Sequence, residues 1–300
     1  MINPHPGLPE FDYLKPGSLP EASQFLHEHA GEARPLLGGT DIFVRMRDGH
    51  WQDKYLVDVK GLDGTDEITF DPSDGLSIGA AINMNRVSAF PEVGKTYPVL
   101  KEAVDSVASY QLRTRATIVG NICNASPAGD TIGACLLLDG VLNVHGLNGM
   151  RQEPLKTFFT GPGETVLEAG DIVTSIRLPV PPPGSVGTYI KLGRNMESDL
   201  SIVGVTALGY PDAEAISGYR FKLALASVAP VPLVPKDVQA YLAEHPIKEE
   251  TLRQAAQIAM DASTPIDDVR AGAHYRKMMV RNLSYKALKA VWEKIEGSGG

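Results

Sequence analysis

The sequence has 300 residues, of which 43% are hydrophobic and 21% are charged, and its net charge of −8 comes without any run of Lys or Arg. This composition predicts a soluble globular chain of two or three domains and excludes a generic nucleic-acid surface. No apolar run is long enough for a membrane span, and two cysteines are too few for a four-cysteine iron–sulfur cluster, so we expect neither a span nor a metal site.

Residues 1–60 alternate short apolar runs with helical spacing, which predicts a small βαβ-like layer. The expected elements are a strand at 11–13, a helix from Ser18 or Glu21 that closes at Gly31, a strand at 34–37, a helix capped by Thr40 or Asp41, and a strand at 56–59.

Residues 61–178 change to shorter strands separated by turns. We expect strands at 67–70, 76–80, 141–144 and 173–179, one helix over 98–112, and a buried helix within 130–140. The proline-rich segment Pro179–Gly184 is the best domain boundary. Beyond it the pattern predicts strands at 188–192, 200–208 and 219–228, helices at 251–260 and 275–295, and a flexible tail at 297–300.

Two loops are the candidate ligand-binding segments of the sequence. Leu36–Asp41 and Thr117–Asp130 each follow an apolar, strand-like run and are rich in small and hydroxyl-bearing residues. Glycine lets the backbone approach a ligand closely, and successive N–H groups in one concavity bind phosphate oxygens. The two loops therefore suggest a clamp around one pyrophosphate. The alternative interpretation is that Gly38–Asp41 is an ordinary strand-to-helix turn and that Asn121 serves only its own turn.

An ordered set of motifs resembles the FAD-binding medium subunit of molybdenum hydroxylases, a family that includes the flavin subunits of carbon monoxide dehydrogenases, xanthine dehydrogenases and aldehyde oxidoreductases. The motifs cover nearly the whole chain: Phe11–Leu19, Leu37–Asp41, Leu76–Ala80, Gln111–Asn121, Asn124–Asp130, Tyr189–Arg194, Ser227–Pro230, Asp268–Arg270 and Tyr275–Arg276.

The resemblance implies an α+β fold. A PCMH/VAO-type FAD-binding unit of two subdomains, 1–60 and 61–178, would be followed by the hinge at 179–184 and a smaller α+β domain of sheet plus helices at 185–296. The tail at 297–300 lies outside these domains.

The resemblance also implies how FAD is held. Backbone of the two loops would surround the pyrophosphate, through Leu37, Gly38, Gly39, Thr40 and Asp41 in the first loop and Thr117, Ile118, Gly120 and Asn121 in the second. Ser126 and Asp130 would bind ribityl or ribose hydroxyls, and Lys191, Arg194 and Asp199 would lie beside the isoalloxazine ring.

Each side chain has an alternative role. Asp130 would instead cap the following helix, Lys191 would be solvated, and Arg194 would pair only with Asp199. Val119 departs from the glycine pair usual in the family. Because a β-branched residue is strained at positive φ, we expect β dihedrals there.

The implied function is electron transfer without a catalytic acid or base in this chain. Electrons would come from the [2Fe–2S] clusters of a small partner subunit, after a large subunit with a molybdenum cofactor has oxidised the substrate. FAD would pass them to NAD⁺, a quinone, a carrier or O₂. The implied assembly is a dimer of heterotrimers. The N-terminus lacks the features of a signal peptide, so we expect a cytoplasmic location.

Two other functions stay open. A stand-alone flavin oxidoreductase on a related fold would need a proton donor near the flavin, for which Ser201 and Glu197 are candidates. A flavin-free scaffold subunit would need only surfaces for its partners.

Overall fold

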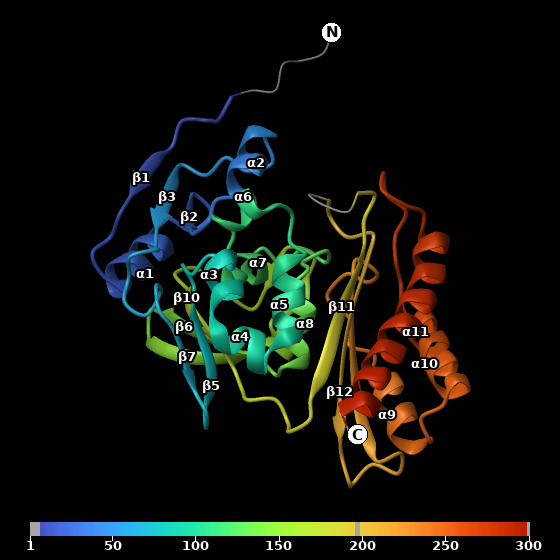
Figure 1. The fold of residues 1–300 in the computed structure, drawn as a ribbon. Helices are drawn as coiled ribbons and strands as arrows, with labels where there is room; N and C mark the ends of the chain where they lie inside the picture. The colour runs from blue at the N-terminus through green and yellow to red at the C-terminus, as the bar shows by residue number, and fades with distance from the viewer. Residues whose placement is uncertain (1–6, 196–198, 299–300) are drawn as a thin grey trace.

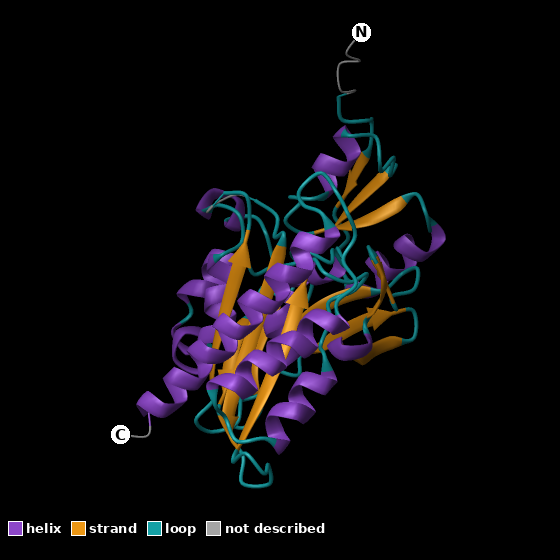
Figure 2. Ribbon diagram, turned by 90° about the vertical axis from the view of Figure 1, so that its right-hand side faces the viewer, coloured by secondary structure: helices purple, strands orange, loops and turns teal. Residues whose placement is uncertain are grey.

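The computed structural model describes residues 7–195 and 199–298. At the N-terminal end a three-stranded parallel sheet in the order β1-β3-β2 carries two helices (Figures 1 and 2). Its elements are β1 (Asp12–Leu14), α1 (Leu19–Glu28), β2 (Ala33–Leu36), α2 (Ile42–Arg47) and β3 (Tyr55–Asp58).

The two N-terminal helices begin differently. Ser18 caps α1 as predicted, because its hydroxyl oxygen accepts a hydrogen bond from the Glu21 N–H at 3.3 Å. The predicted side-chain cap of α2 is absent. Asp41 stands at the N-cap position with helical dihedrals and makes no capping bond. A helical N-cap residue does not present its side chain to the first-turn N–H groups in the way an extended one does.

The middle of the chain forms a five-stranded antiparallel sheet in the order β4-β5-β10-β6-β7, with short helices packed on it. The strands are β4 (Ile68–Asp71), β5 (Gly75–Gly79), β6 (Val141–Gly146), β7 (Gly149–Pro154) and β10 (Ile172–Leu178). The helices are α3 (Met84–Ala89), α4 (Pro91–Thr96), α5 (Pro98–Asp105), α6 (Tyr110–Arg113), α7 (Ile118–Cys123) and α8 (Ile132–Leu137). A 3₁₀ turn η1 (Leu155–Thr157) precedes the small hairpin of β8 (Phe159–Gly161) and β9 (Glu164–Thr165).

The single helix predicted over 98–112 is wrong. The chain breaks after α5 at a turn where Ala108 has a φ of 42°, and Ser109 then caps α6 by accepting from the Leu112 N–H at 3.3 Å. The apolar stripe over 98–108 gave no sign of this interruption, which a Ser N-cap makes favourable.

The strand-like conformation expected at the start of the second loop is also wrong, because Ile118–Cys123 forms the helix α7. Thr117 caps it, with its hydroxyl accepting from the Gly120 N–H at 2.9 Å. Val119 therefore has helical and not β dihedrals. Ile118 and Ile122, four residues apart, are both fully buried, so tertiary packing overrides the β propensity of these branched side chains.

The C-terminal part is a three-stranded antiparallel sheet of β11 (Val186–Leu192), β12 (Val203–Pro211) and β13 (Tyr219–Ala226). Helices α5 and α8 pack against this sheet from the middle part of the chain. The terminal helices α9 (Lys236–Glu244), α10 (Glu249–Ala262) and α11 (Ala273–Ser298) cover it from the other side, as Figure 1 shows. Helix α9 was not predicted, and α11 extends through Gly297 and Ser298, which were expected in a flexible tail. Among the described residues no helix is both long and apolar enough to cross a membrane.

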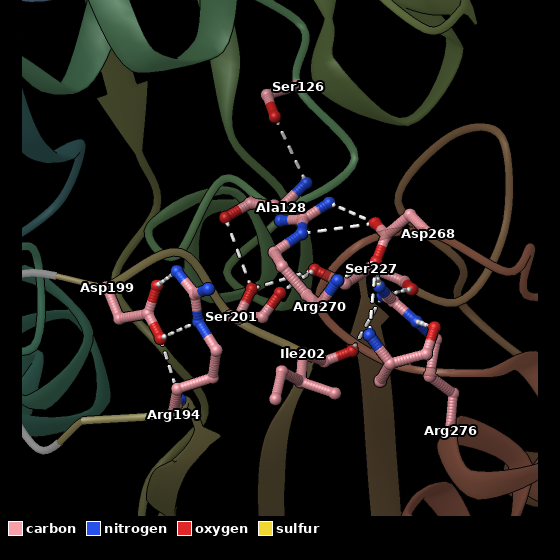
Figure 3. Close-up of polar contacts among 11 residues, drawn as sticks. Ser126, Ala128, Arg194, Asp199, Ser201, Ile202, Ser227, Asp268, Arg270 and Arg276 are labelled. Carbon is pink, nitrogen blue, oxygen red and sulfur yellow. Dashed lines mark hydrogen bonds and ion pairs between the residues drawn. The ribbon is translucent and has the colours of Figure 1, made fainter.

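A buried arginine ties α11 to this sheet. Arg276 is 1% exposed, and its guanidinium donates to the carbonyl oxygens of Ile202 at 3.0 Å and Ser227 at 2.9 Å (Figure 3). Its charge is balanced by Asp268 at 2.6 Å, which also accepts from Arg270 at 2.7 Å. Burial raises the pKa of Asp268, but the hydrogen bonds from Arg270 and Arg276 outweigh it and hold the pKa well below its ordinary value.

Replacing Asp268 by Asn should lower the free energy of unfolding by about 3 kcal/mol at neutral pH, because it leaves the Arg276 guanidinium buried without its counter-charge. Urea unfolding followed by circular dichroism measures this loss. Asp66→Asn is the matched control. Its partner Arg86 is half exposed, so the loss should stay below about 1 kcal/mol. Equal losses of unfolding free energy in the two variants would contradict the role of Asp268 as the counter-charge of buried Arg276.

The Asp268–Arg276 ion pair should also make the free energy of unfolding depend on pH. The pKa of Asp268 is depressed on folding, so its contribution is present above the unfolded value of about 3.9 and is lost as the pH falls through the lower folded value. The stability gap between wild type and Asp268→Asn should therefore narrow below about pH 4. A gap that stays constant from neutral pH to about pH 3 would contradict this linkage.

Candidate functional site

A cavity of about 830 Å³ opens between the N-terminal sheet, the middle part of the chain and the start of β12. Its walls come from the two glycine-containing loops, from the segment Leu167–Val173 that leads into β10, and from Asp199 and Leu200. This volume lies in the range of small-molecule and cofactor sites.

The first loop presents bare backbone to this cavity. After β2 ends at Leu36, the chain turns through Gly39, whose φ of +73° lies in the left-handed region that favours glycine. Within the described part of the chain, the N–H groups of Gly38, Gly39 and Thr40 have no hydrogen-bond acceptor. Adjacent unpaired N–H groups on a cavity wall form an anion-binding surface.

Gly38 brings the two loops into contact. A Cβ built on it would lie 2.2 Å from the carbonyl oxygen of Arg115, just before the second loop. Only glycine allows the backbone of one loop to lie this close to the backbone of the other. Both loops therefore line one cavity, as the sequence suggested.

The second loop is more ordered than predicted. Asn121 lies within α7, and its side-chain oxygen accepts from the Thr131 hydroxyl at 2.8 Å. Asn121 therefore does not serve a left-handed turn. It ties α7 to the residue that precedes α8. Gly120 lies on the cavity wall, and a Cβ there would come within 2.8 Å of the Thr117 hydroxyl oxygen.

Asp130 lines the cavity and is 6% exposed. Its carboxylate accepts from the Tyr189 hydroxyl at 2.6 Å and from the Lys191 ammonium at 2.7 Å, so it does not cap α8. Burial raises the pKa of Asp130, while the charge and hydrogen bond of Lys191 act in the opposite direction. Lys191 is 13% exposed and is not the solvated lysine of the alternative interpretation.

Arg194 and Asp199 pair with each other across their loop, as the alternative interpretation held (Figure 3). The Asp199 carboxylate accepts from the Arg194 backbone N–H at 2.7 Å and from its guanidinium at 3.2 Å. The guanidinium of Arg194 lowers the pKa of Asp199 to about 2. Asp199 contributes to the cavity wall, whereas the side chain of Arg194 is 58% exposed.

Most residues predicted from the sequence are brought together on this cavity wall: Leu37, Gly38, Gly39, Thr40, Asp41, Thr117, Gly120, Asn121, Ser126, Asp130 and Asp199. Three lie elsewhere. Ile118 is fully buried in the core, Lys191 reaches the wall through Asp130, and Arg194 does so through Asp199. Val119, which the sequence set aside, lines the cavity.

The structure adds residues that sequence reasoning missed. Tyr189 holds Asp130, although the sequence offered only its place two residues before Lys191. At another part of the wall two arginines lie against Trp51, with the guanidinium carbon of Arg34 3.8 Å and that of Arg45 4.9 Å from a ring centroid. No sequence spacing marks this stack, because its members come from separate elements.

Of the two candidate proton donors for a stand-alone enzyme, Ser201 alone lies among the described residues. Ser201 is fully buried and bonded to the Ala128 carbonyl and the Ser227 hydroxyl, and Glu197 lies outside the described residues. Both cysteines, Cys123 and Cys135, are free thiols whose pKa burial raises to about 12. Within residues 7–195 and 199–298, no three His, Cys, Asp or Glu side chains are grouped to hold a metal ion.

Two family models match the chain. One, described as the FAD binding domain in molybdopterin dehydrogenase, matches residues 9–181, and the other, the CO dehydrogenase flavoprotein C-terminal domain, matches residues 188–291.

Individual relatives match over nearly their whole length. The chain is 28% identical to a putative xanthine dehydrogenase FAD-binding subunit of Escherichia coli K12, over 96% of this chain and 97% of the relative. It is 29% identical to the carbon monoxide dehydrogenase medium chain of Hydrogenophaga pseudoflava, over 95% and 98%. A solved structure of carbon monoxide dehydrogenase from that organism superposes with a TM-score of 0.90, at 29% identity and the same coverage.

Gly38→Ala should destabilise the protein by about 1–3 kcal/mol, because its Cβ would meet a backbone oxygen that cannot rotate away. Thermal or urea unfolding measures the loss. Gly61→Ala is the control, since a Cβ there meets nothing within 4 Å. If both variants unfold like the wild type, the contact between the two loops is not as close as described.

Proposed function

We propose a function from one premise: the chain belongs to the family of FAD-binding proteins of molybdopterin dehydrogenases. It is accordingly a FAD-binding subunit of a molybdenum-dependent oxidoreductase. The role that we propose within that family is electron transfer, and the observation that carries it is a single cavity lined by both glycine-containing loops.

The cavity fits FAD by its donors. Backbone of the first loop from Leu37 to Asp41, with its unpaired N–H groups at positions 38–40, would face the pyrophosphate. Backbone of Thr117, Ile118, Gly120 and Asn121 would face it from the second loop. Glycine at position 38 lets this loop lie directly against the backbone of Arg115, and glycine at position 120 leaves room for the Thr117 hydroxyl that caps α7. Ser126 and Asp130 would bind sugar hydroxyls.

Three further residues would act near the flavin ring. Lys191, Arg194 and Asp199 would form its surroundings, and Lys191 would favour negative charge on reduced flavin. Asp199 lies on the cavity wall and fixes Arg194, while Lys191 is fixed by Asp130.

The domain division that we propose follows the sequence prediction. Residues 1–60 and 61–178 would form the two parts of the FAD-binding unit, 179–184 the hinge, and 185–296 the C-terminal domain. In support, one apolar core lies mainly around the five-stranded sheet and is joined by Leu208 and Ala224 of the C-terminal sheet, while a second core lies between the C-terminal sheet and its outer helices.

The partners that we propose are a small subunit with [2Fe–2S] clusters and a large subunit with a molybdenum cofactor, in a dimer of heterotrimers in the cytoplasm. When bound, FAD would supply a centre that takes up electrons one at a time from such clusters and gives them up singly or as a pair. The residues of this chain would hold it between the small subunit and an acceptor such as NAD⁺, a quinone, a carrier or O₂. The names of relatives as medium chains and FAD-binding subunits support such an assembly.

The purified chain should carry or take up FAD. Its visible absorption spectrum, recorded with and without added FAD, should have the bands of oxidised flavin, and heating should release FAD and not FMN, because both loops are needed only for a pyrophosphate. A protein that stays colourless with excess FAD would contradict the site and favour the flavin-free scaffold.

Electron transfer is tested in the assembled enzyme. Flavin bound to this chain should be reduced when the molybdenum subunit is given its substrate, and omission of the chain should abolish turnover with the flavin-dependent acceptor. Full turnover without the chain would refute the proposed role. Bleaching of the isolated flavoprotein by a substrate would instead indicate a stand-alone oxidoreductase.

A further inference from the structure

The cavity segment between α7 and α8, Ser126–Asp130, has no regular secondary structure and is held from behind by the C-terminal sheet. The Ser227 N–H donates to the Pro127 carbonyl at 2.7 Å, and the Ser201 hydroxyl lies 3.3 Å from the Ala128 carbonyl. Figure 3 shows the line of bonds from Ser126 through Ala128 to Ser201 and Ser227. Residues far apart in the sequence therefore fix the shape of this wall.

The third attachment involves the only carboxylate in the segment. Tyr189 donates its hydroxyl to one oxygen of Asp130, and Lys191 donates its ammonium to the other. Both donors stand on β11, two residues apart and therefore on the same face of the strand. Lys191 also donates to the Ser106 carbonyl at 3.1 Å, which fixes its position independently of Asp130.

We propose that Tyr189 is a positioning residue for the cofactor, which acts by orienting the Asp130 carboxylate toward a sugar hydroxyl of the ligand. This inference rests on the proposed binding of FAD in the cavity. With each carboxylate oxygen already bonded to one fixed donor, the plane of the carboxylate is set before the ligand arrives. The remaining lone pairs of the Asp130 carboxylate can then accept a hydrogen bond from a ligand hydroxyl. Binding costs little conformational entropy at Asp130, because its side chain is already held in one orientation.

Burial explains why the orientation needs dedicated donors. Asp130 is 6% exposed, so water does not solvate its carboxylate, and each missing donor leaves a charged oxygen unsatisfied. Burial also raises the pKa of Tyr189, so that its phenol stays protonated and donates. The C-terminal domain thereby completes a pocket whose other walls come from the rest of the chain.

The neighbouring residue on β11 provides a matched control. Thr188 donates its hydroxyl to Glu102 of α5 at 2.9 Å, a bond across the same junction that does not reach the cavity segment. Thr188→Val and Tyr189→Phe each remove one hydroxyl hydrogen bond between β11 and the preceding part of the chain. Only Tyr189→Phe changes the support of Asp130.

The test is FAD titration of the apoprotein of each full-length variant, followed by flavin fluorescence. Tyr189→Phe should raise the dissociation constant of FAD about tenfold, since a hydrogen bond to a charged group is lost, while Thr188→Val should change it less than about twofold. In an Asp130→Ala background the Tyr189→Phe effect should disappear, because the two residues act as one unit.

The outcomes separate the two proposals. If the wild-type chain binds no FAD, the proposed function fails. If it binds FAD and Tyr189→Phe binds equally well, or if the Tyr189→Phe effect persists without Asp130, the positioning role is overturned. If circular dichroism shows that Tyr189→Phe does not fold, the FAD dissociation constant of Lys191→Gln is measured instead, with and without Asp130→Ala. An effect of Lys191→Gln that persists without Asp130 would then overturn the proposed orientation of the carboxylate by its two donors.

Discussion

The arrangement depends on the close approach of two backbone segments at Gly38. The Arg115 carbonyl oxygen occupies the space where any other residue would have its Cβ. This contact seats the N-terminal sheet against the middle part of the chain, so that the loop after β2 and the start of α7 share one cavity. The N–H groups on this cavity wall can stay unpaired because neither the N-terminal sheet nor the middle part of the chain supplies carbonyl acceptors for them.

The C-terminal sheet supplies the remaining constraint. It packs between α5 and α8 on one side and the terminal helices on the other. It reaches the cavity segment through Tyr189 of β11, through Ser201 just before β12 and through Ser227 just after β13. The buried Arg276–Asp268 pair secures the same end of β12 and β13 to α11. The cavity is thus lined by residues of both regions that the family models match, since Asp199 and Leu200 belong to the second.

Residue type and spacing were enough to predict part of the fold. The Ser18 cap and the βαβ-like order of the first layer follow from residue type and spacing, and both were predicted. The second loop was misread because Ile118, Val119 and Ile122 favour a strand by themselves. Thr117 can accept from the Gly120 N–H only when the chain turns into a helix, and burial of the branched side chains stabilises that helix. The break after α5 escaped prediction because the apolar stripe runs up to residue 108 without interruption, and the Ser109 N-cap that follows it was not recognised.

The sequence by itself determined the family, the α+β class and the two glycine-containing loops, because these depend on ordered motifs and on residues whose backbone freedom is local. The tertiary structure decided which side chains meet. Tyr189 and Lys191 share one face of β11, but Asp130 lies in a loop about sixty residues earlier, and the roles left open for Asp130 and Lys191 were distinguished only by their mutual contact. Long-range pairing of buried polar groups follows from how the layers pack, which one-dimensional spacing does not record.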